Sequence, residues 1–270
     1  MRVAGWLGAL VAGAVVGSIA AAGPVAAAPV PPPPPHTEIV GGEPADAGQF
    51  PWVVRLSVGC AGALTAPRVV LTAAHCVERT GFDSGITVIA GSVDQHSPDA
   101  IRVKSRYVIR ASGFRDATKG DDWALIQLAQ EIDLPLLPRA ADGSYDQGTF
   151  TIMGWGSTRD GSATQQRYLR TAEVPYVSDR QCGRAYREVG YPFVASEMIC
   201  AGDTRRGGVD ACQGDSGGPM VRRDAAGEWV QVGIVSWGVG CARRDYPGVY
   251  TQVSEYVGVI ERKTSELSNA

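Results

Sequence analysis

The sequence predicts an all-β fold, because its apolar residues fall in many short runs and not in long helical stretches. These runs are rich in β-branched residues and are separated by Gly, Pro and Asp, a pattern typical of a β-barrel or a β-sandwich. The clearest runs are Trp52 to Val58, Val69 to Leu71, Ile86 to Ile89, Ile101 to Val103, Tyr107 to Ile109, Thr149 to Met153 and Val230 to Ser236. Only Ser254 to Leu267 has helical spacing, which places Val253, Val257 and Ile260 on one face.

Composition sets the class of protein. The chain has 270 residues, of which 44% are hydrophobic and 20% charged, so it can form one globular unit or two fused small barrels, and disorder of the body is excluded. Its net charge of −3 gives no signal for nucleic acid or for a membrane surface. We expect neither as a stable partner.

The N-terminus resembles an export signal. Arg2 precedes a small and apolar run, Val3 to Ala22, which predicts a secretory signal peptide over residues 1–27. A membrane anchor is the alternative, because the run is long, but its Ala and Gly content makes it weakly hydrophobic. Pro29 disfavours cleavage directly before it, so we expect cleavage after Ala27, with an uncertainty of a few residues.

A proline run follows the signal. Pro31 to Pro35 are consecutive, which predicts an extended, solvated segment. We interpret residues 28–38 as a short propeptide and residues 39–270 as the mature protein, which we expect to be secreted and extracellular.

The most informative motif surrounds one serine. Gln213-Gly214-Asp215-Ser216-Gly217-Gly218-Pro219 is rich in glycine, which lets backbone N–H groups turn toward a reacting carbonyl oxygen. Serine is a weak nucleophile unless a base, an orienting group and oxyanion donors are present. By itself the motif is consistent with an ordinary turn, so the remaining partners decide its meaning.

The base and its orienting acid are His75 and Asp122. The chain has three histidines, and His36 and His96 lie in polar or proline-rich surroundings with no partner pattern. His75 follows an apolar run in Thr72-Ala73-Ala74-His75-Cys76, and Asp122 precedes the apolar run that starts at Trp123. The order His, Asp, Ser along the chain is that of the chymotrypsin-type catalytic triad.

Several segments together carry a resemblance to trypsins of the chymotrypsin family of serine proteases, and to secreted bacterial trypsins in particular. The resemblance extends from Ile39 to about Tyr250. Its segments are Ile39-Val40-Gly41-Gly42, Thr72 to Cys76, Asp122 to Leu125, Gly214 to Pro219, Ser236-Trp237-Gly238 and Pro247 to Tyr250.

An α/β-hydrolase is the competing class of enzyme, because Gly214 to Gly218 also matches a GxSxG motif. That fold needs its histidine after the nucleophile. No histidine follows Ser216, so this class is excluded by chain order.

The resemblance implies two antiparallel six-stranded β-barrels with the active site between them and a C-terminal helix, the chain crossing between barrels near residues 135–143. It implies a catalytic triad of His75, Asp122 and Ser216, with the N–H groups of Gly214 and Ser216 as the oxyanion hole. Ser236 resembles the residue that supports the buried aspartate. The expected activity is that of a secreted serine endopeptidase which cuts after Arg or Lys through an acyl-enzyme.

Specificity follows from the residue six positions before the nucleophile, Asp210. The resemblance places it in the primary pocket, where a carboxylate favours Arg or Lys because an unpaired buried charge is costly. The other expected substrate-binding residues are Ala211, Ser236, Trp237, Gly238 and Gly248. Ala211 stands where many trypsins have a hydroxyl residue, so we expect Arg to be preferred over Lys, since Arg binds a carboxylate through its planar fork.

The resemblance also implies a zymogen. Cleavage before Ile39 would free an amine that pairs with Asp215 and orders the oxyanion hole and the pocket. The residue before Ile39 is Glu38, which an Asp210 pocket should repel. We therefore expect a protease of different specificity to activate the precursor.

Six cysteines lie in the predicted mature region, and export favours disulfides. Counting alone leaves fifteen pairings for six cysteines; the resemblance selects Cys60–Cys76, Cys182–Cys200 and Cys212–Cys241. No Cys-x-x-Cys spacing occurs, which argues against zinc. We assign no metal and no cofactor.

Protein and peptide substrates are the expected partners, protein protease inhibitors are further candidates, and we expect a monomer.

Two alternatives stay open: a catalytically silent family member used for binding, and a membrane-tethered form with an uncleaved signal. Retention of His75, Asp122, Ser216 and Ile39 favours the enzyme.

Overall fold

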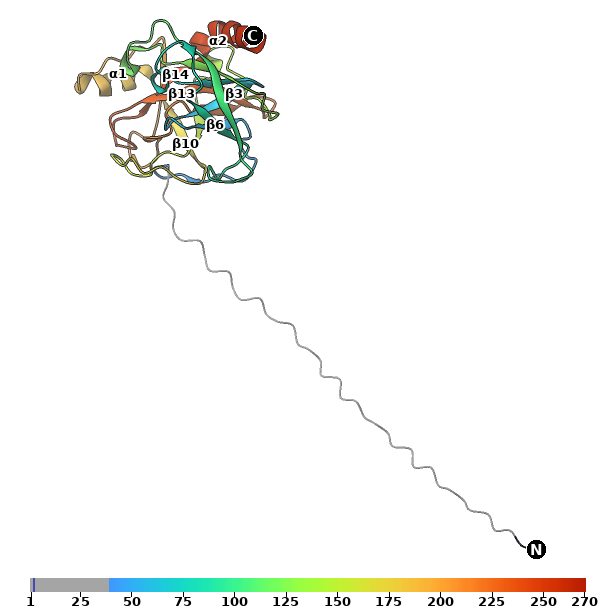
Figure 1. Cartoon of the computed structure of the whole chain (residues 1–270). Helices are drawn as coiled ribbons and strands as arrows, with labels where there is room; N and C mark the ends of the chain where they lie inside the picture. The colour runs from blue at the N-terminus through green and yellow to red at the C-terminus, as the bar shows by residue number, and fades with distance from the viewer. Residues whose placement is uncertain (1, 3–38) are drawn as a thin grey trace. The chain divides into compact units, whose positions relative to one another are not determined.

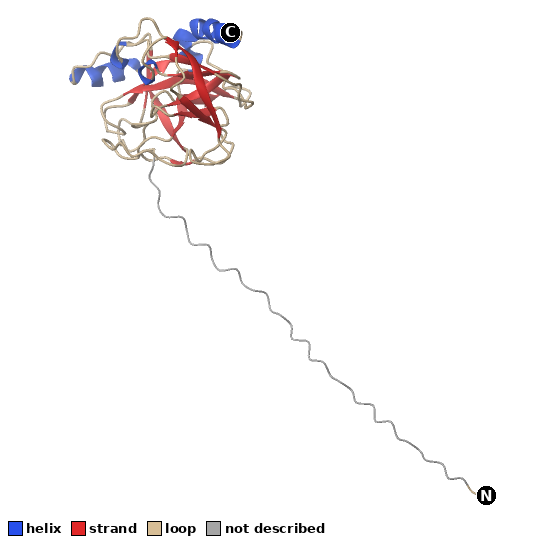
Figure 2. Cartoon of the chain, in the orientation of Figure 1, coloured by secondary structure: helices blue, strands red, loops and turns tan. Residues whose placement is uncertain are grey.

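The computed structural model of the chain describes Arg2 and residues 39–270. The predicted signal peptide and propeptide lie outside these described residues, apart from Arg2. The body that contains residues 39–270 is built from β-strands, with two α-helices and three short 3-10 helices at its periphery (Figures 1 and 2).

The first half of the body is a closed six-stranded antiparallel barrel. Its strands follow the spatial order β7-β6-β2-β3-β4-β8, and β8 pairs back onto β7 to close the sheet. A short seventh strand, β5, is added to the outside of β7. The strands are β2 (Val53–Leu56), β3 (Ala61–Ala66), β4 (Val69–Thr72), β5 (Gly81–Phe82), β6 (Thr87–Ala90), β7 (Ile101–Arg110) and β8 (Ala124–Leu128).

The second half repeats this architecture. Its order is β10-β11-β14-β13-β12-β9, and β9 pairs with β10 to close the barrel, while β1 is added to β10. The strands are β1 (Glu43–Pro44), β9 (Thr149–Gly154), β10 (Arg170–Val177), β11 (Met198–Ala201), β12 (Pro219–Arg223), β13 (Trp229–Trp237) and β14 (Gly248–Gln252). The predicted fold of two six-stranded barrels is therefore confirmed.

The chain passes from one barrel to the other between the end of β8 at Leu128 and the start of β9 at Thr149. This connection contains the 3-10 helix η3 (Gly143–Tyr145). The other two 3-10 helices, η1 (Ala74–Cys76) and η2 (Ala117–Lys119), lie in loops of the first barrel.

The C-terminal helix connects the two barrels. Helix α2 (Val253–Ser268) follows β14 of the second barrel directly, yet its buried residues belong to the apolar core of the first barrel. Those residues are Val253, Tyr256, Ile260, Thr264 and Leu267, a spacing of three or four that keeps one face inward. The predicted helix is confirmed, but Val257 lies at the edge of the buried face and is only partly covered.

Helix α1 (Asp179–Glu188) was not predicted. Its buried residues are Cys182 and Tyr186, which stand four positions apart among mostly polar neighbours, so the apolar face is narrow. Strand β7 is also longer than expected: it joins the predicted runs Ile101 to Val103 and Tyr107 to Ile109 through a polar stretch in which Ser105 is buried.

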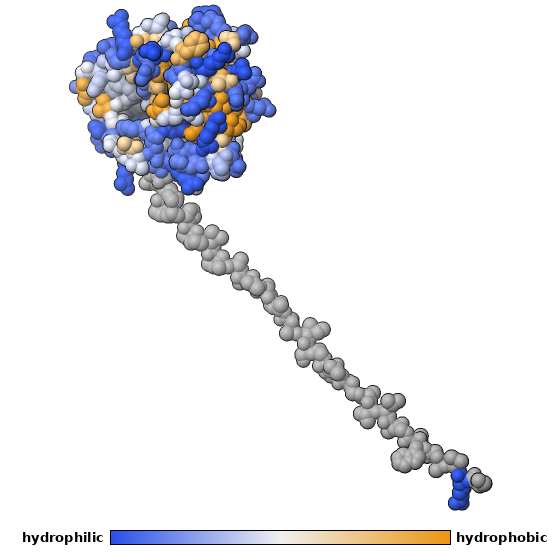
Figure 3. Space-filling model, in the orientation of Figure 1, coloured by the Kyte–Doolittle hydropathy of each residue, from blue (hydrophilic) through white to orange (hydrophobic). Residues whose placement is uncertain are grey.

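The surface of the body combines polar residues with scattered apolar ones (Figure 3). Phe82 is the most exposed of the large apolar side chains, at 84%. Among the described residues, no helix combines the length and apolar character needed to cross a membrane.

Candidate active site

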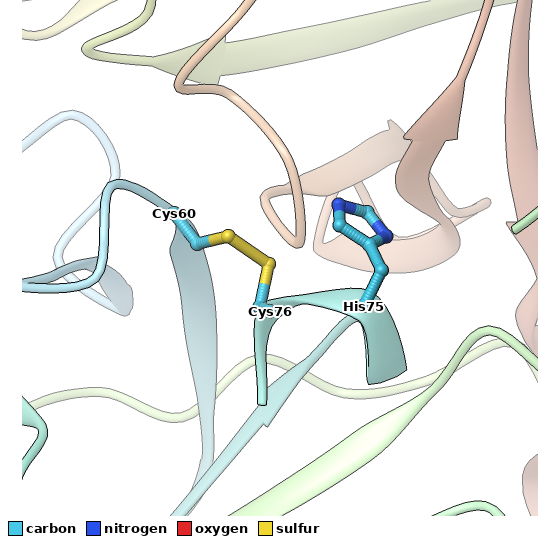
Figure 4. A group of neighbouring side chains, drawn as sticks. All are labelled: Cys60, His75 and Cys76. Carbon is cyan, nitrogen blue, oxygen red and sulfur yellow. A yellow bond between two sulfur atoms is a disulfide. The ribbon is translucent and has the colours of Figure 1, made fainter. Parts of the chain in front are cut away.

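The loop that carries His75 is held by covalent and polar contacts. His75 lies in η1, which follows β4, and the neighbouring Cys76 is bonded to Cys60, the residue before β3 (Figure 4). Arg110 of β7 donates from Nε to the carbonyl of Ala74 over 3.1 Å. The imidazole is therefore presented from a fixed turn, with 26% of its side chain exposed.

Asp122 contacts His75 twice. Its Oδ2 lies 2.8 Å from the ring Nδ1, and its Oδ1 accepts from the backbone N–H of His75 over 2.9 Å. Because a carboxylate can only accept hydrogen bonds, Nδ1 carries the proton in this contact. The other ring nitrogen, Nε2, is then free to accept a proton.

Asp122 is itself almost fully buried, at 1% exposure. Ser236 at the end of β13 donates to its Oδ2 over 2.5 Å, and Thr251 of β14 donates to its main-chain oxygen over 2.8 Å. Both donors come from the second barrel, so the first-barrel acid is oriented by residues across the interface.

A strained turn precedes Asp122. Gly120 and Asp121 have φ of +89° and +54°, a region that residues other than glycine seldom adopt. The Asp121 N–H donates to Glu197 Oε2 and to the Tyr256 hydroxyl, both over 3.0 Å, which holds the turn. Burial, together with the nearby charge of Glu197, raises the pKa of Asp121.

The Ser216 loop is packed between the barrels. The N–H of Ala61 donates to the carbonyl of Ser216, and the N–H of Gly217 donates to Val235, each over 2.8 Å. Gly217 has φ of +78°, and a Cβ there would lie 2.1 Å from Thr72 Oγ1. Glycine is therefore required both for the conformation and for close approach to the strand that leads into His75.

These contacts bring the Ser216 loop beside the His75 loop. Within residues 39–270, no hydrogen bond yet joins the Ser216 hydroxyl to the His75 ring. Such bonds are often long in ligand-free serine enzymes and tighten on binding.

Ser216 lines a cavity of about 210 Å³. The predicted substrate-binding residues also line it: Asp210, Ala211, Ser236, Trp237, Gly238 and Gly248. A Cβ on Gly248 would lie 2.6 Å from Asp210 Oδ1, whereas one on Gly238 would meet nothing closer than 3.4 Å. Gly248 is thus required by the packing around Asp210, and Gly238 only leaves the cavity wall bare.

Asp210 is a buried carboxylate in this cavity, with 4% exposure. It accepts hydrogen bonds from the N–H groups of Ala211 (2.8 Å) and Ala242 (3.1 Å). Burial nevertheless raises its pKa to about 7. Within residues 39–270 no arginine or lysine forms an ion pair with Asp210, so its two backbone N–H donors offset only part of the cost of burial.

Asp215, beside Ser216, is a third buried carboxylate. Its oxygens accept from the N–H groups of Gly156 (2.7 Å) and Cys212 (2.9 Å). Burial raises its pKa to about 6, against the opposing effects of these bonds and of the positive charge of Arg55. Ile39 is also buried, at 1% exposure, within the core of the second barrel.

The structure joins the same cysteine pairs that the resemblance implies: Cys60–Cys76, Cys182–Cys200 and Cys212–Cys241. The last of these links the Ser216 loop to the cavity wall. The sulfurs of Cys60 and Cys76 also lie within 4.8 Å of a His75 ring nitrogen, and Figure 4 shows this disulfide beside the His75 side chain. Because metal binding by cysteine requires a thiolate, these disulfide sulfurs do not make the cluster a metal site.

Sequence analysis missed the residues that support the site from a distance. They are Arg55, Gln165, Glu197, Thr251 and Tyr256. Only Arg55 left a signal, as a single charge inside the apolar run Val53-Val54-Arg55-Leu56.

Known proteins match this chain over nearly its whole length. The trypsin family model matches residues 39–260. A trypsin-like protease of Streptomyces glaucescens is 49% identical over 259 residues, which cover 96% of this chain and 93% of that protein. A trypsin of Saccharopolyspora erythraea is 39% identical, with 82% of this chain and 96% of that protein covered. Trypsin Blo t 3 of Blomia tropicalis is 36% identical, with 83% and 85% covered. The chain therefore belongs to the trypsin family, and it is a trypsin-like serine endopeptidase with the chymotrypsin fold.

Proposed function

We propose that this protease is a secreted enzyme that hydrolyses peptide bonds after Arg or Lys, with Arg favoured. The observation that carries the proposal is the buried carboxylate of Asp210 in the cavity that Ser216 also lines. A guanidinium or ammonium entering that cavity would compensate the charge of Asp210. A neutral or acidic side chain would leave the carboxylate unpaired, which is costly in a buried site.

Catalysis would use His75, Asp122 and Ser216. His75 would accept the Ser216 proton at Nε2 as the serine oxygen attacks the carbonyl carbon, and would then return that proton to the leaving amine. Asp122 would hold Nδ1–H and stabilise the imidazolium. The resulting acyl-enzyme would be hydrolysed by water through the same steps.

The oxyanion hole would consist of the N–H groups of Gly214 and Ser216. Gly214 has φ of +104°, a conformation that glycine adopts without strain. Each such donor stabilises the transition state by roughly 3–4 kcal/mol in serine proteases. The loop bonds to Ala61 and Val235 support the role of Ser216, because they hold the backbone at Ser216 and Gly217.

Ala211 supports the preference for Arg. It lines the cavity next to Asp210 and offers no side-chain acceptor. An ammonium has three donors in a compact head, so it gains more from an extra oxygen than a guanidinium that already binds a carboxylate with two parallel N–H groups.

We further propose that the enzyme is made as a precursor, with residues 1–27 as signal peptide and residues 28–38 as propeptide. Cleavage before Ile39 would free an ammonium group as counter-ion for Asp215. Two observations support this: Ile39 is buried in the second-barrel core, and Val40 accepts a hydrogen bond from the N–H of Asp210 over 3.2 Å. The new terminus would thus lie close to both the pocket and the Ser216 loop.

The first prediction concerns specificity. Mature protein that begins at Ile39 should cleave peptides with Arg or Lys before the scissile bond with kcat/KM on the order of a thousandfold or more above peptides with Phe or Glu. The measurement is kcat/KM on four peptides that differ only at that residue. Asp210→Ser is the matched control and should lose most of the activity on Arg. A wild-type preference for Phe would overturn the pocket assignment, and no turnover would favour a binding protein.

The second prediction concerns Ala211. Ala211→Ser adds an acceptor that an ammonium uses better than a guanidinium, so kcat/KM for Lys should rise relative to Arg by roughly threefold to tenfold. Matched Arg and Lys peptides measure the ratio in both proteins. An unchanged ratio would show that position 211 does not discriminate between the two cations.

The third prediction concerns pH. Burial raises the pKa of Asp210 to about 7, so below that pH the carboxyl of Asp210 is mostly protonated. Binding of a benzamidine cation must then displace this proton. The association constant of benzamidine should therefore be flat above about pH 7 and fall as pH decreases below it, approaching tenfold per unit. Titration calorimetry on the uncut His75→Ala chain gives the measurement, because Asp215 there has no Ile39 ammonium beside it and no imidazole contributes. 

Asp210→Ser in the same His75→Ala background is the control for this measurement. It should bind benzamidine weakly, and any remaining pH dependence reports Asp215, whose pKa burial raises to about 6. A pH-independent association constant between pH 5 and 8 in the parent protein would contradict the prediction, because it would mean that Asp210 is ionised throughout.

The fourth prediction concerns activation. The Ser216→Ala precursor cannot process itself, and its Glu38 carboxylate would be repelled by Asp210 of an added mature enzyme. We expect no conversion of this precursor, whereas the matched Glu38→Arg, Ser216→Ala precursor should be converted. N-terminal sequencing for a chain that begins at Ile39 gives the readout. Conversion of both at similar rates would show that activation does not need a second protease.

A further inference from the structure

Arg55 is a charged residue in the middle of a buried strand. All four residues of β2 are buried, and Arg55 is only 4% exposed. β2 lies between β3 and β6 in the first barrel, where an apolar residue would be expected. A buried charge is retained only where polar partners compensate its lost hydration, so its partners indicate its purpose.

The partners of Arg55 are neutral acceptors from three separate segments. Nη1 donates to the carbonyl of Cys60 and, over 3.5 Å, to the carbonyl of Gly214; Nη2 donates to Oε1 of Gln165. Gln165 in turn donates from Nε2 to the carbonyl of Gly59 over 3.2 Å. Within residues 39–270 no carboxylate forms an ion pair with this guanidinium, and its charge acts on Asp215 at longer range.

Gly214 is the partner that belongs to the active site. With φ of +104° and no Cβ, its backbone has few internal restraints. Neighbouring groups supply them: a Cβ on Gly214 would lie 2.7 Å from Gln165 Nε2 and 3.0 Å from Gly156 Cα. Arg55 holds the carbonyl of Gly214 and also holds the Gln165 side chain that packs against it.

We propose that Arg55 is a positioning residue for the oxyanion hole, which it orders by clamping the Gly214 carbonyl and the Gln165 side chain together. The direction of the Gly214 N–H depends on the φ and ψ that these two contacts restrict. The inference rests on the proposed function, in which that N–H stabilises the developing oxyanion.

The guanidinium is suited to this role in a way that an ammonium is not. Its planar fork reaches three acceptors in fixed directions, whereas lysine presents one compact charge. The bond to Cys60 adds a second link, because Cys60 is bonded to Cys76 beside His75. Arg55 thus connects the loop of the base to the loop of the nucleophile.

The experiment compares three variants of the mature enzyme. Arg55→Met keeps side-chain bulk and removes the donors and the charge; Arg55→Lys keeps the charge alone. Arg139→Met is the matched control, because Arg139 is also largely buried, with 13% of its side chain exposed, but pairs with Glu261 of α2 at 3.8 Å. Each is measured for kcat and KM on an Arg peptide amide and for inhibition by benzamidine and by a peptide ending in arginine aldehyde.

The two inhibitors separate positioning from general damage. Benzamidine occupies the pocket and forms no oxyanion, whereas the aldehyde reacts with Ser216 to a tetrahedral adduct whose oxygen occupies the oxyanion hole. Losing one oxyanion donor costs roughly 10²–10³ in kcat, and a misdirected donor should cost less. For Arg55→Met we expect kcat to fall about tenfold to a hundredfold, with KM and benzamidine inhibition within about twofold, and aldehyde inhibition weakened in step with kcat/KM.

The kcat and the aldehyde inhibition of Arg55→Lys should lie between those of wild type and Arg55→Met. For Arg139→Met both quantities should be close to wild type. A folded Arg55→Met enzyme with unchanged kcat would overturn the proposal. Equal weakening of benzamidine and aldehyde would also overturn it, because it would show that Arg55 supports the whole pocket. If Arg55→Met does not fold, Gln165→Leu provides the same comparison and should lower kcat with benzamidine inhibition unchanged.

Failure of the proposed function would look different. The wild-type enzyme would then cleave peptides with a residue other than Arg or Lys most efficiently, and the proposed specificity for these two residues would be wrong. The comparison of Arg55→Met with wild type on that peptide, with the corresponding aldehyde, would still test Arg55.

Discussion

Three buried carboxylates, those of Asp122, Asp210 and Asp215, impose the constraint on which the site depends. An ionised carboxylate removed from water costs several kcal/mol unless donors replace its hydration. Asp122 accepts hydrogen bonds from the His75 ring and the Ser236 hydroxyl. Asp210 and Asp215 each accept hydrogen bonds from two backbone N–H groups. Each set of donors fixes a loop, so the need to satisfy these acids also determines the geometry of the site.

The two barrels supply those donors from opposite sides. His75 and Asp122 lie at the ends of first-barrel strands, but Ser236 and Thr251, which hold Asp122, belong to the second barrel. Ala61 of the first barrel in turn holds the Ser216 loop. Neither barrel alone could orient these side chains, which explains why the candidate site lies where the two barrels meet.

The short β-branched runs were sufficient to predict an all-β fold, whereas the two barrels and the residues that the structure brings together around the cavity were implied by the resemblance that the motifs carry. Short β-branched runs predict strands, and the motifs around His75, Asp122 and Ser216 are contiguous. What the sequence could not show depends on contacts between distant segments. The partners of Arg55 lie up to 159 residues away, and α1 is stabilised by burying only Cys182 and Tyr186. A single charge within a strand and a helix with only two buried residues are weak signals in the sequence.

Burial explains how the proposed activation and substrate binding reinforce each other. Asp210 and Asp215 each have a pKa raised by desolvation, and the negative charge of Asp215 further raises that of Asp210. The positive charge of Arg55 offsets only part of the rise in the pKa of Asp215, because Arg55 lies beyond ion-pair distance. An ammonium freed at Ile39 would neutralise Asp215 and so make Asp210 easier to ionise. A substrate guanidinium would then meet a carboxylate and not a carboxylic acid. On these proposals, cleavage of the precursor and binding of Arg would each bring a cation to a buried carboxylate, the first from the new N-terminus of the chain and the second from the substrate.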